Sequence, residues 1–328
     1  MPKITVPPLP VSCLLGMIKP SGPTSMSLLN DMQPLLSKSR LFEQPPVGAP
    51  KRKKKRSKKV GDVKVGQGGT LDPLADGILV LGVGKGTKKL TEFLDCTKEY
   101  YTTCLLGCET DSYDSEGARV RLAPWKHVTK EKVVEALKKF RGEIKQTPPI
   151  FSALKMDGKP LYEYARNGIP LPRPIEPRTV TVHSLELVEW KGSAHSFSWP
   201  EKALNEDQKK AMEAAIRGVD KTATIEDDPE STVQDEKPIA FVIKMKVSGG
   251  TYVRSLVHDL AHALGSAGHV VTLTRSRQGR FVLNSTEDGD RTCIPWLVFE
   301  KALTDPGAAD EDGWTEWERE VLQHMEVI

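Results

Sequence analysis

The chain has 328 residues, of which 38% are hydrophobic and 28% charged, a balance typical of a soluble globular protein with ample material for a core. No apolar run approaches the length of a membrane span, and the first residues show neither a secretory signal nor an Arg-rich transit peptide. The five cysteines form no C-x-x-C pair, so we expect a reducing intracellular compartment and no zinc site.

The net charge of +3 hides a strong segregation of charge along the chain. Residues 201–237 hold eleven acidic and six basic residues, and residues 286–328 hold twelve and three. The rest of the chain is therefore strongly basic. A basic body with acidic segments indicates a polyanionic partner, most simply a nucleic acid.

Residues 16–25 predict a short strand and a turn, followed by a helix that Thr24 or Ser25 caps. The apolar side chains of this helix are Met26, Leu28, Leu29, Met32 and Leu36. We expect the helix to have a structural role.

Residues 41–63 form an insertion that contains a basic tract at 51–59, with eight basic residues in nine. Such a block repels itself and is expected to be disordered when free. A nuclear localisation signal, an RNA-binding arm, or both fit this composition.

Residues 68–77 concentrate three glycines and one proline around Asp72. Because Pro73 biases the residue before it towards an extended backbone, the loop should hold this carboxylate in a set direction. Residues 78–83 follow as a buried strand that anchors the loop. By spacing alone, a Gly-rich turn with a capping aspartate is the simpler interpretation.

Residues 82–89, G-V-G-K-G-T-K-K, suggest a phosphate-binding loop but lack the G-x-x-x-x-G-K-[ST] spacing. A nucleotide-dependent transferase is therefore a weak alternative. The same glycines and lysines also suit contacts with RNA phosphates.

Further along, residues 98–107, 178–187 and 241–247 predict strands, and residues 129–140 predict an amphipathic helix. In the first of these strands, Tyr100 and Tyr101 should point to opposite faces.

Residues 191–237 interrupt the pattern with many acids and few β-formers, which indicates a peripheral insertion with one short helix near 206–216.

Residues 248–256 turn from a strand into a helix whose first turn contains Arg254. The glycines and the helix N-terminus present backbone N–H groups, a natural anion site. A cation in the first turn opposes the helix dipole, so Arg254 should have a partner elsewhere in the fold.

Several of these stretches, in order along the chain, resemble the motifs of the TruB family of pseudouridine synthases, which act on the uridine at position 55 of tRNA. The matching stretches are 16–25, 64–77, 98–117, 146–166, 248–256 and 273–281. Colinear motifs are far more specific than one motif alone.

The resemblance implies roles for three catalytic positions. Asp72 would be the nucleophile, Arg254 would pair with it, and Tyr100 would stack on the target base. A flipped-out base stacked on an aromatic ring is a known way to hold single-stranded RNA.

The resemblance also implies that Tyr252 and Leu273 line the base pocket. Gln67 stands where the family often has histidine, and its amide could still donate a hydrogen bond near the base. Lys155 lies in the Q-x-P-P-x-x-S-A-x-K segment and is suited to a phosphate contact.

The fold implied is α+β, the pseudouridine synthase catalytic fold, with a mixed and mostly antiparallel sheet flanked by helices. Residues 1–285 would form the catalytic domain, interrupted by the insertions at 41–63 and 191–237. Residues 286–328 would form an acidic extension in place of a C-terminal RNA-binding domain. This arrangement resembles the eukaryotic nuclear and mitochondrial branch of the family.

The expected function is therefore isomerisation of the tRNA T-loop uridine 55, with the T-arm of tRNA as partner and messenger RNA as a further partner left open. We expect no cofactor, no metal, no membrane and a monomer, located in the nucleus with the mitochondrion as a second compartment. Two alternatives remain: a non-catalytic RNA-binding or tRNA-folding protein of the same fold, and the nucleotide-dependent transferase.

Overall fold

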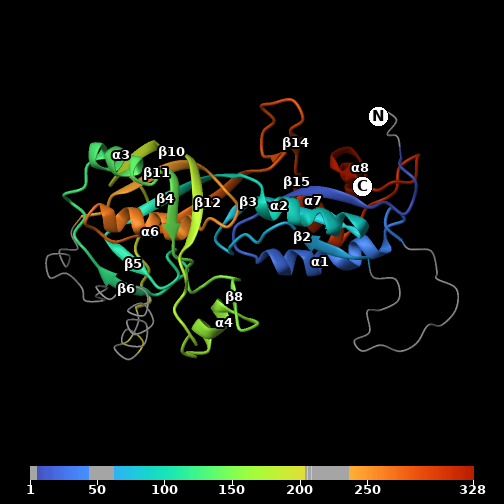
Figure 1. Ribbon diagram of the computed structural model, residues 1–328. Coiled ribbons are helices and arrows are strands. Elements are labelled where there is room, and N and C mark those ends of the chain that lie inside the picture. Colours follow the sequence, from blue (N-terminus) through green and yellow to red (C-terminus); the bar gives the residue numbers. More distant parts are fainter. Residues whose placement is uncertain (1–5, 44–62, 204, 206–207, 209–235) are drawn as a thin grey trace. The chain divides into compact units, whose positions relative to one another are not determined.

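The computed structural model describes residues 6–43, 63–203, 205, 208 and 236–328. The basic tract at 51–59, the helix expected at 206–216 and most of both insertions lie outside the described residues. The chain divides into two compact units (Figure 1): residues 1–98 with 274–328, and residues 99–273.

The first unit combines segments from the two ends of the sequence, blue and red in Figure 1. At its centre, β1 pairs antiparallel with β3 along its whole length, parallel with β15 and antiparallel with β16. β2 pairs antiparallel with β3, and the end of β12 pairs parallel with the start of β3. The strands are β1 (Cys13–Lys19), β2 (Val65–Gln67), β3 (Asp76–Val83), β12 (Gly268–Gln278), β13 (Phe281–Val282), β14 (Arg291–Thr292), β15 (Ile294–Pro295) and β16 (Glu326–Val327).

Helices accompany this sheet. In the first of them, Thr24 is the cap, because its side chain accepts a hydrogen bond from the Ser27 N–H. Four of the expected apolar side chains are buried, and Met26 is exposed. The helices are α1 (Ser25–Lys38), the 3-10 helix η1 (Gly84–Lys89), α2 (Leu90–Asp95), α7 (Trp296–Thr304) and α8 (Glu316–His324).

The glycines of the segment 82–89 are explained by close packing. A Cβ at Gly86 would collide with the backbone of Cys13 in β1, and a Cβ at Gly82 would lie 2.7 Å from the Gly86 backbone. Only glycine lets the backbone segments come this close at Gly82 and Gly86. The glycines therefore give no support to a phosphate-binding loop.

The second unit carries β12, β4, β11, β10 and β7 as neighbours in that order. β10 pairs antiparallel with both β11 and β7. Its strands are the first part of β12, β4 (Lys98–Leu106), β5 (Cys108–Thr110), β6 (Arg119–Leu122), β7 (Gly142–Gln146), β8 (Lys155–Met156), β9 (Lys159–Pro160), β10 (Arg178–Gly192) and β11 (Ala240–Val247). Its helices are α3 (Lys130–Lys138), α4 (Leu161–Arg166) and α6 (Val253–Ala263).

The expected α+β class with mixed, mostly antiparallel pairing is confirmed. The division into 1–285 and an extension 286–328 stays a prediction. The structure adds that β15 and β16, from the second of these ranges, both pair with β1.

The cysteines and the length of the helices bear on two other expectations. All five cysteines are free thiols. Across the described ranges, no helix has both the length and the apolar character needed to cross a membrane.

Candidate active site

The loop 68–77 connects β2 to β3 in the first unit and contains Asp72, which is half-buried. Gly69 and Gly77 have φ angles of 118° and 98°, in the region that favours glycine. At Gly77, a Cβ would also collide with the carbonyl oxygen of Arg275. The sequence therefore specifies one backbone path for the residues on both sides of Asp72.

Lys19, at the end of β1, is fully buried and binds the C-terminal half of this loop. Its Nζ donates to the carbonyl oxygens of Pro73 at 3.2 Å, Ala75 at 2.6 Å and Pro20 at 2.8 Å. Burial lowers the pKa of Lys19 to about 8, although the nearby carboxylates of Asp76 and Asp72 act to raise it. A buried ammonium group thus fixes the backbone directly after Asp72.

Ser25 fixes the residue directly before Asp72. Its Oγ donates to the Leu71 carbonyl oxygen at 2.9 Å and accepts from the Leu71 N–H at 3.0 Å. Both contacts are buried, so one hydroxyl satisfies both backbone groups of a single loop residue. The helix expected to be structural therefore begins with a side chain that holds the Asp72 loop.

Two side chains from the end of β12 hold the start of the loop. The buried Arg275 donates to the carbonyl oxygens of Gly69 at 3.2 Å and Ile78 at 2.7 Å. The Gln278 amide, also buried, donates to the carbonyl oxygen of Gly68. Sequence reasoning missed Lys19, Arg275 and Gln278, although all three lie inside the matching stretches 16–25 and 273–281.

Gln67, a predicted substrate contact, lies on β2 beside this loop. Its Nε2 donates to Thr70 Oγ1 at 3.2 Å, and its Oε1 is buried without a hydrogen-bond partner. A buried acceptor without a partner is uncommon in folded proteins. Contact of this amide with the target base stays a prediction.

Arg254 lies in the second unit, in the first turn of α6, and is 3% exposed. Its Nη1 donates to the Ser112 carbonyl oxygen at 2.6 Å and its Nη2 to that of Phe151 at 2.9 Å. Its Nε lies 3.7 Å from Asp114 Oδ2. The guanidinium thus joins the segments around residues 112–114 and 151. Asp72 belongs to the first unit, and the pairing of Arg254 with it stays a prediction.

The other predicted positions also lie in the second unit. On β4, Tyr100 is buried and Tyr101 is 38% exposed, as strand alternation predicts. Tyr252 caps α6, and its backbone exchanges two hydrogen bonds with the Gln146 amide, at 2.8 and 2.9 Å. Leu273 is buried on β12, and Lys155 is exposed on β8. Their roles stay predictions.

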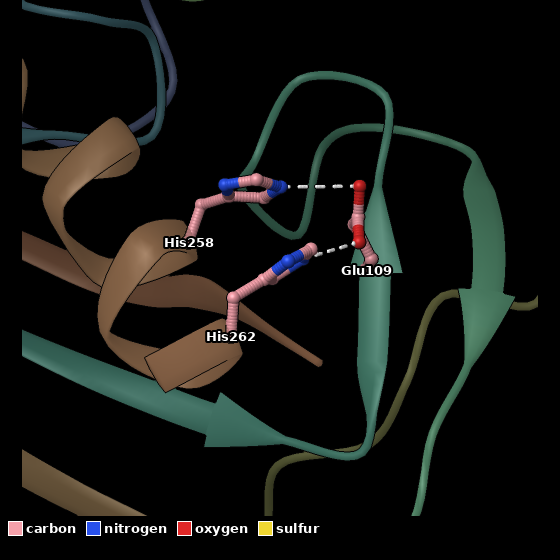
Figure 2. Close-up of side chains that lie close together, drawn as sticks. All are labelled: Glu109, His258 and His262. Carbon is pink, nitrogen blue, oxygen red and sulfur yellow. Dashed lines mark hydrogen bonds and ion pairs between the residues drawn. The ribbon is translucent and has the colours of Figure 1, made fainter. Parts of the chain in front are cut away.

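The face of α6 that carries Arg254 continues with His258 and His262, which contact Glu109 on β5 (Figure 2). Burial lowers the pKa of His258, but the carboxylates of Glu109 and Asp259 raise it to about 9. Burial raises the pKa of Glu109, whereas His258 and His262 bring it well below its usual value. Sequence reasoning missed this cluster, whose one sequence signal is the spacing of four between the histidines.

Comparison with known proteins decides the family. The model of the TruB family pseudouridylate synthase N-terminal domain matches residues 53–202. The tRNA pseudouridine synthase 4 of Schizosaccharomyces pombe is 36% identical over 87% of this chain and 82% of its own length. The Saccharomyces cerevisiae protein of the same name is 35% identical over 94% of this chain and 84% of its own length. The chain belongs to the TruB family of pseudouridine synthases.

A solved structure, that of a Cbf5-Nop10-Gar1 complex, shares the TruB chain's fold with a TM-score of 0.52 and 20% identity. The match covers 97% of this chain and 60% of the solved chain. At this identity the likeness concerns the fold, which agrees with the expected pseudouridine synthase architecture. The TruB family model includes the loop 68–77 and the strand with Tyr100, and the two yeast relatives support the eukaryotic branch of the TruB family.

Proposed function

We propose that this protein is a tRNA pseudouridine synthase that isomerises the uridine at position 55 in the T-loop. The observation that carries the proposal is the Asp72 loop, held by the buried side chains of Lys19, Ser25, Arg275 and Gln278 in a chain of the TruB family. A nucleophile must be held in a fixed position to react efficiently. These side chains meet that requirement because they hold the backbone on both sides of the Asp72 carboxylate.

In the proposed reaction, the Asp72 carboxylate attacks C1′ of the target ribose as the bond from C1′ to N1 of uracil breaks. The released uracil turns, and C5 forms a carbon–carbon bond to C1′ as the carboxylate leaves. The hydrogen on C5 is lost and N1 gains one, so the atoms of substrate and product are the same. Covalent catalysis divides one difficult step into two easier ones.

The surrounding residues have proposed roles as well. Arg254 keeps Asp72 ionised and oriented, and Tyr100 stacks on the everted base. Tyr252 and Leu273 line the base pocket and Gln67 contacts the base. The exposed Lys155 contacts RNA phosphates.

The proposed partner is the T-arm of tRNA, with other RNAs that carry a T-loop-like element, including messenger RNA, as further candidates. The protein acts as a monomer in the nucleus, with the mitochondrion as a second compartment. The basic tract at 51–59 supports import, non-specific RNA affinity, or both.

The test is incubation of the purified protein with an unmodified tRNA transcript, followed by mapping of pseudouridine along the RNA. We expect modification at position 55 alone, and none in a transcript that carries cytidine there. Tight binding without turnover would favour the non-catalytic RNA-binding protein. Thermal stabilisation by ATP would favour the transferase.

Tyr100 and Tyr101 provide a matched pair of substitutions on one strand. Because Tyr100 is buried and Tyr101 is 38% exposed, Tyr100→Ala should reduce pseudouridine formation at least about 100-fold, whereas Tyr101→Ala should leave the rate within about threefold. Rates under single turnover and melting temperatures of both variants provide the check. Equal losses of rate at equal stability would contradict the assignment.

Ser25→Ala removes both hydrogen bonds to Leu71 and leaves two buried backbone groups without a partner. We expect a loss of about 1–3 kcal/mol in stability and a rate of pseudouridine formation about 10- to 100-fold lower, because the Asp72 loop becomes less well positioned. Affinity for tRNA should change little. Ser27→Ala, on the same helix but at a half-buried residue whose hydroxyl donates to the Thr24 carbonyl oxygen, is the control and should match the wild type in rate.

A further inference from the structure

The side chains of Glu109, His258 and His262 converge on one point of the second unit (Figure 2). The Nε2 of His258 lies 3.1 Å from Glu109 Oε1, and the Nε2 of His262 lies 2.9 Å from Glu109 Oε2. Two histidines four residues apart on a helix project from the same face. Among the residues that the structure describes, these three form the one group of histidine, cysteine and acidic side chains whose potential ligand atoms all lie within 4.8 Å of one another.

The two ring nitrogens of His258 both face carboxylates. Its Nδ1 lies 3.1 Å from Asp259 Oδ1. With a cation bound at Nε2, the Nδ1–H would donate to Asp259, which is the usual arrangement around a metal-bound histidine.

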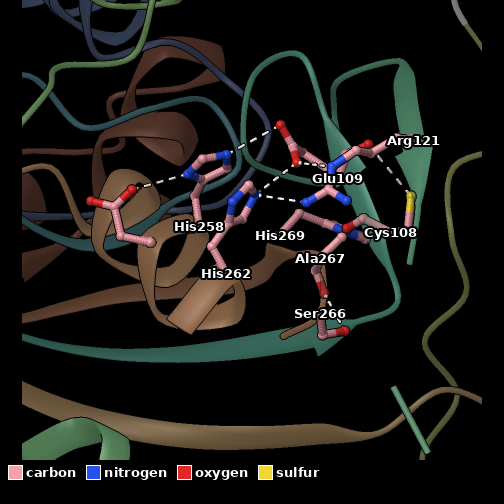
Figure 3. Close-up of polar contacts among 9 residues, drawn as sticks. Cys108, Glu109, Arg121, His258, His262, Ser266, Ala267 and His269 are labelled. Carbon is pink, nitrogen blue, oxygen red and sulfur yellow. Dashed lines mark hydrogen bonds and ion pairs between the residues drawn. The ribbon is translucent and has the colours of Figure 1, made fainter. Parts of the chain in front are cut away.

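The Nε2 of His262 lies near one acceptor and one donor. It lies 2.9 Å from Glu109 Oε2 and 3.0 Å from Nη2 of Arg121, which itself contacts Glu109 (Figure 3). One ring nitrogen cannot donate to the carboxylate and accept from the guanidinium at the same time. A metal ion between Nε2 and the carboxylate would use the lone pairs of both atoms.

We propose that Glu109, His258 and His262 bind one divalent transition-metal ion, with Zn²⁺ as the best chemical match. Two imidazoles and one carboxylate form an established zinc ligand set, and water can complete the coordination. The carboxylate side chain is 6% exposed, which favours a retained ion, and the His262 side chain is 42% exposed, which gives an entry path. The guanidinium of Arg121 contacts the Glu109 carboxylate, so it would compete with the metal ion for this ligand.

Such an ion would join β5 to α6 one helical turn beyond Arg254. Tyr113, in the segment after β5, stacks on the His258 ring with centroids 4.0 Å apart, and the preceding residue, Ser112, accepts from Arg254. The ion would therefore hold in place the helix and the segment that position the Arg254 guanidinium. Because metal binding is measured directly, the metal site can prove absent while the proposed reaction stands. In the same way, the protein can bind the metal even if the proposed reaction is wrong.

The experiment uses the full chain, without a histidine tag and freed of metal by a chelator, titrated with ZnCl2 in a calorimeter. We expect one Zn²⁺ per chain with a Kd below about 1 µM and a higher melting temperature with Zn²⁺. Substitution with Co²⁺ should give the visible absorption of a four-coordinate ion.

His262→Ala tests the site with little risk to folding, because this side chain is the most exposed of the three. It should weaken binding at least about tenfold and abolish the shift in melting temperature. His183→Ala, also at an exposed histidine of the second unit, should match the wild type. The proposal is overturned if the wild type shows no saturable binding, or if the two variants bind Zn²⁺ alike.

Discussion

Asp72→Asn should lower pseudouridine formation on the order of 10⁴-fold or more, because an amide cannot act as the nucleophile at the ribose carbon. The contacts of Lys19, Ser25 and Gln278 with the loop are made to backbone atoms, so the substitution leaves them in place. We therefore expect tRNA affinity within about threefold of wild type and stability within about 0.5 kcal/mol. Single-turnover assays, RNA-binding titrations and thermal unfolding measure the three quantities.

Asp76→Asn is the matched control for this prediction. Asp76, the first residue of β3, also lies near Lys19, so its substitution removes a comparable charge from the same surroundings. We expect it to retain at least about a tenth of the wild-type rate. Pseudouridine formation by Asp72→Asn at the wild-type rate would remove the central claim about mechanism.

Arg254→Ala should combine a large loss of rate with a large loss of stability. Removal of the guanidinium leaves the carbonyl oxygens of Ser112 and Phe151 without their donor and the buried Asp114 without its cation. A buried ion pair broken at one partner costs about 3–5 kcal/mol. If Arg254 also orients Asp72, the rate should fall between about 10²- and 10³-fold, measured at a temperature where the variant is folded.

Two further variants separate these effects. Arg254→Lys keeps the charge but loses the planar fork that reaches both carbonyl oxygens, so it should recover part of the rate and little of the stability. Asp114→Asn weakens the ion pair of the second unit and keeps Arg254, so it should lower stability with a rate within about tenfold of wild type. A folded Arg254→Ala variant with the wild-type rate would show that the proposed pairing with Asp72 is wrong.

Local patterns in the sequence predicted several of the longer helices and strands. The apolar run after the Asp72 loop is β3, the alternating run at 241–247 is β11, and the helix with Arg254 in its first turn is α6. β11 and α6 were predictable because burial on one face leaves a period of two or 3.6 in the sequence, and β3 because a strand buried on both faces is a continuous apolar run. The segment 82–89 shows the limit of such patterns, since its glycines reflect contact with β1.

The supports of the site could not be predicted in the same way, because their partners are distant in sequence. Gln278 reaches a carbonyl oxygen 210 residues earlier, at Gly68, and His258 reaches Glu109 across 149 residues. No local spacing encodes such contacts. We expected no zinc site because the cysteines form no C-x-x-C pair. Cysteine spacing has no bearing on a site made of histidine and glutamate.

The pairing of β1 with strands from both ends of the chain has a consequence for synthesis on the ribosome. β1 pairs with β3 on one side and with β15 and β16 on the other, and the whole of residues 99–273 intervenes between β3 and these C-terminal strands. At about 5–20 residues per second, this interval keeps one edge of an apolar strand unpaired for on the order of ten seconds or more. During that time the edge of β1 is a template for association between nascent chains, so co-translational protection by chaperones should matter more for this edge than for the continuous second unit.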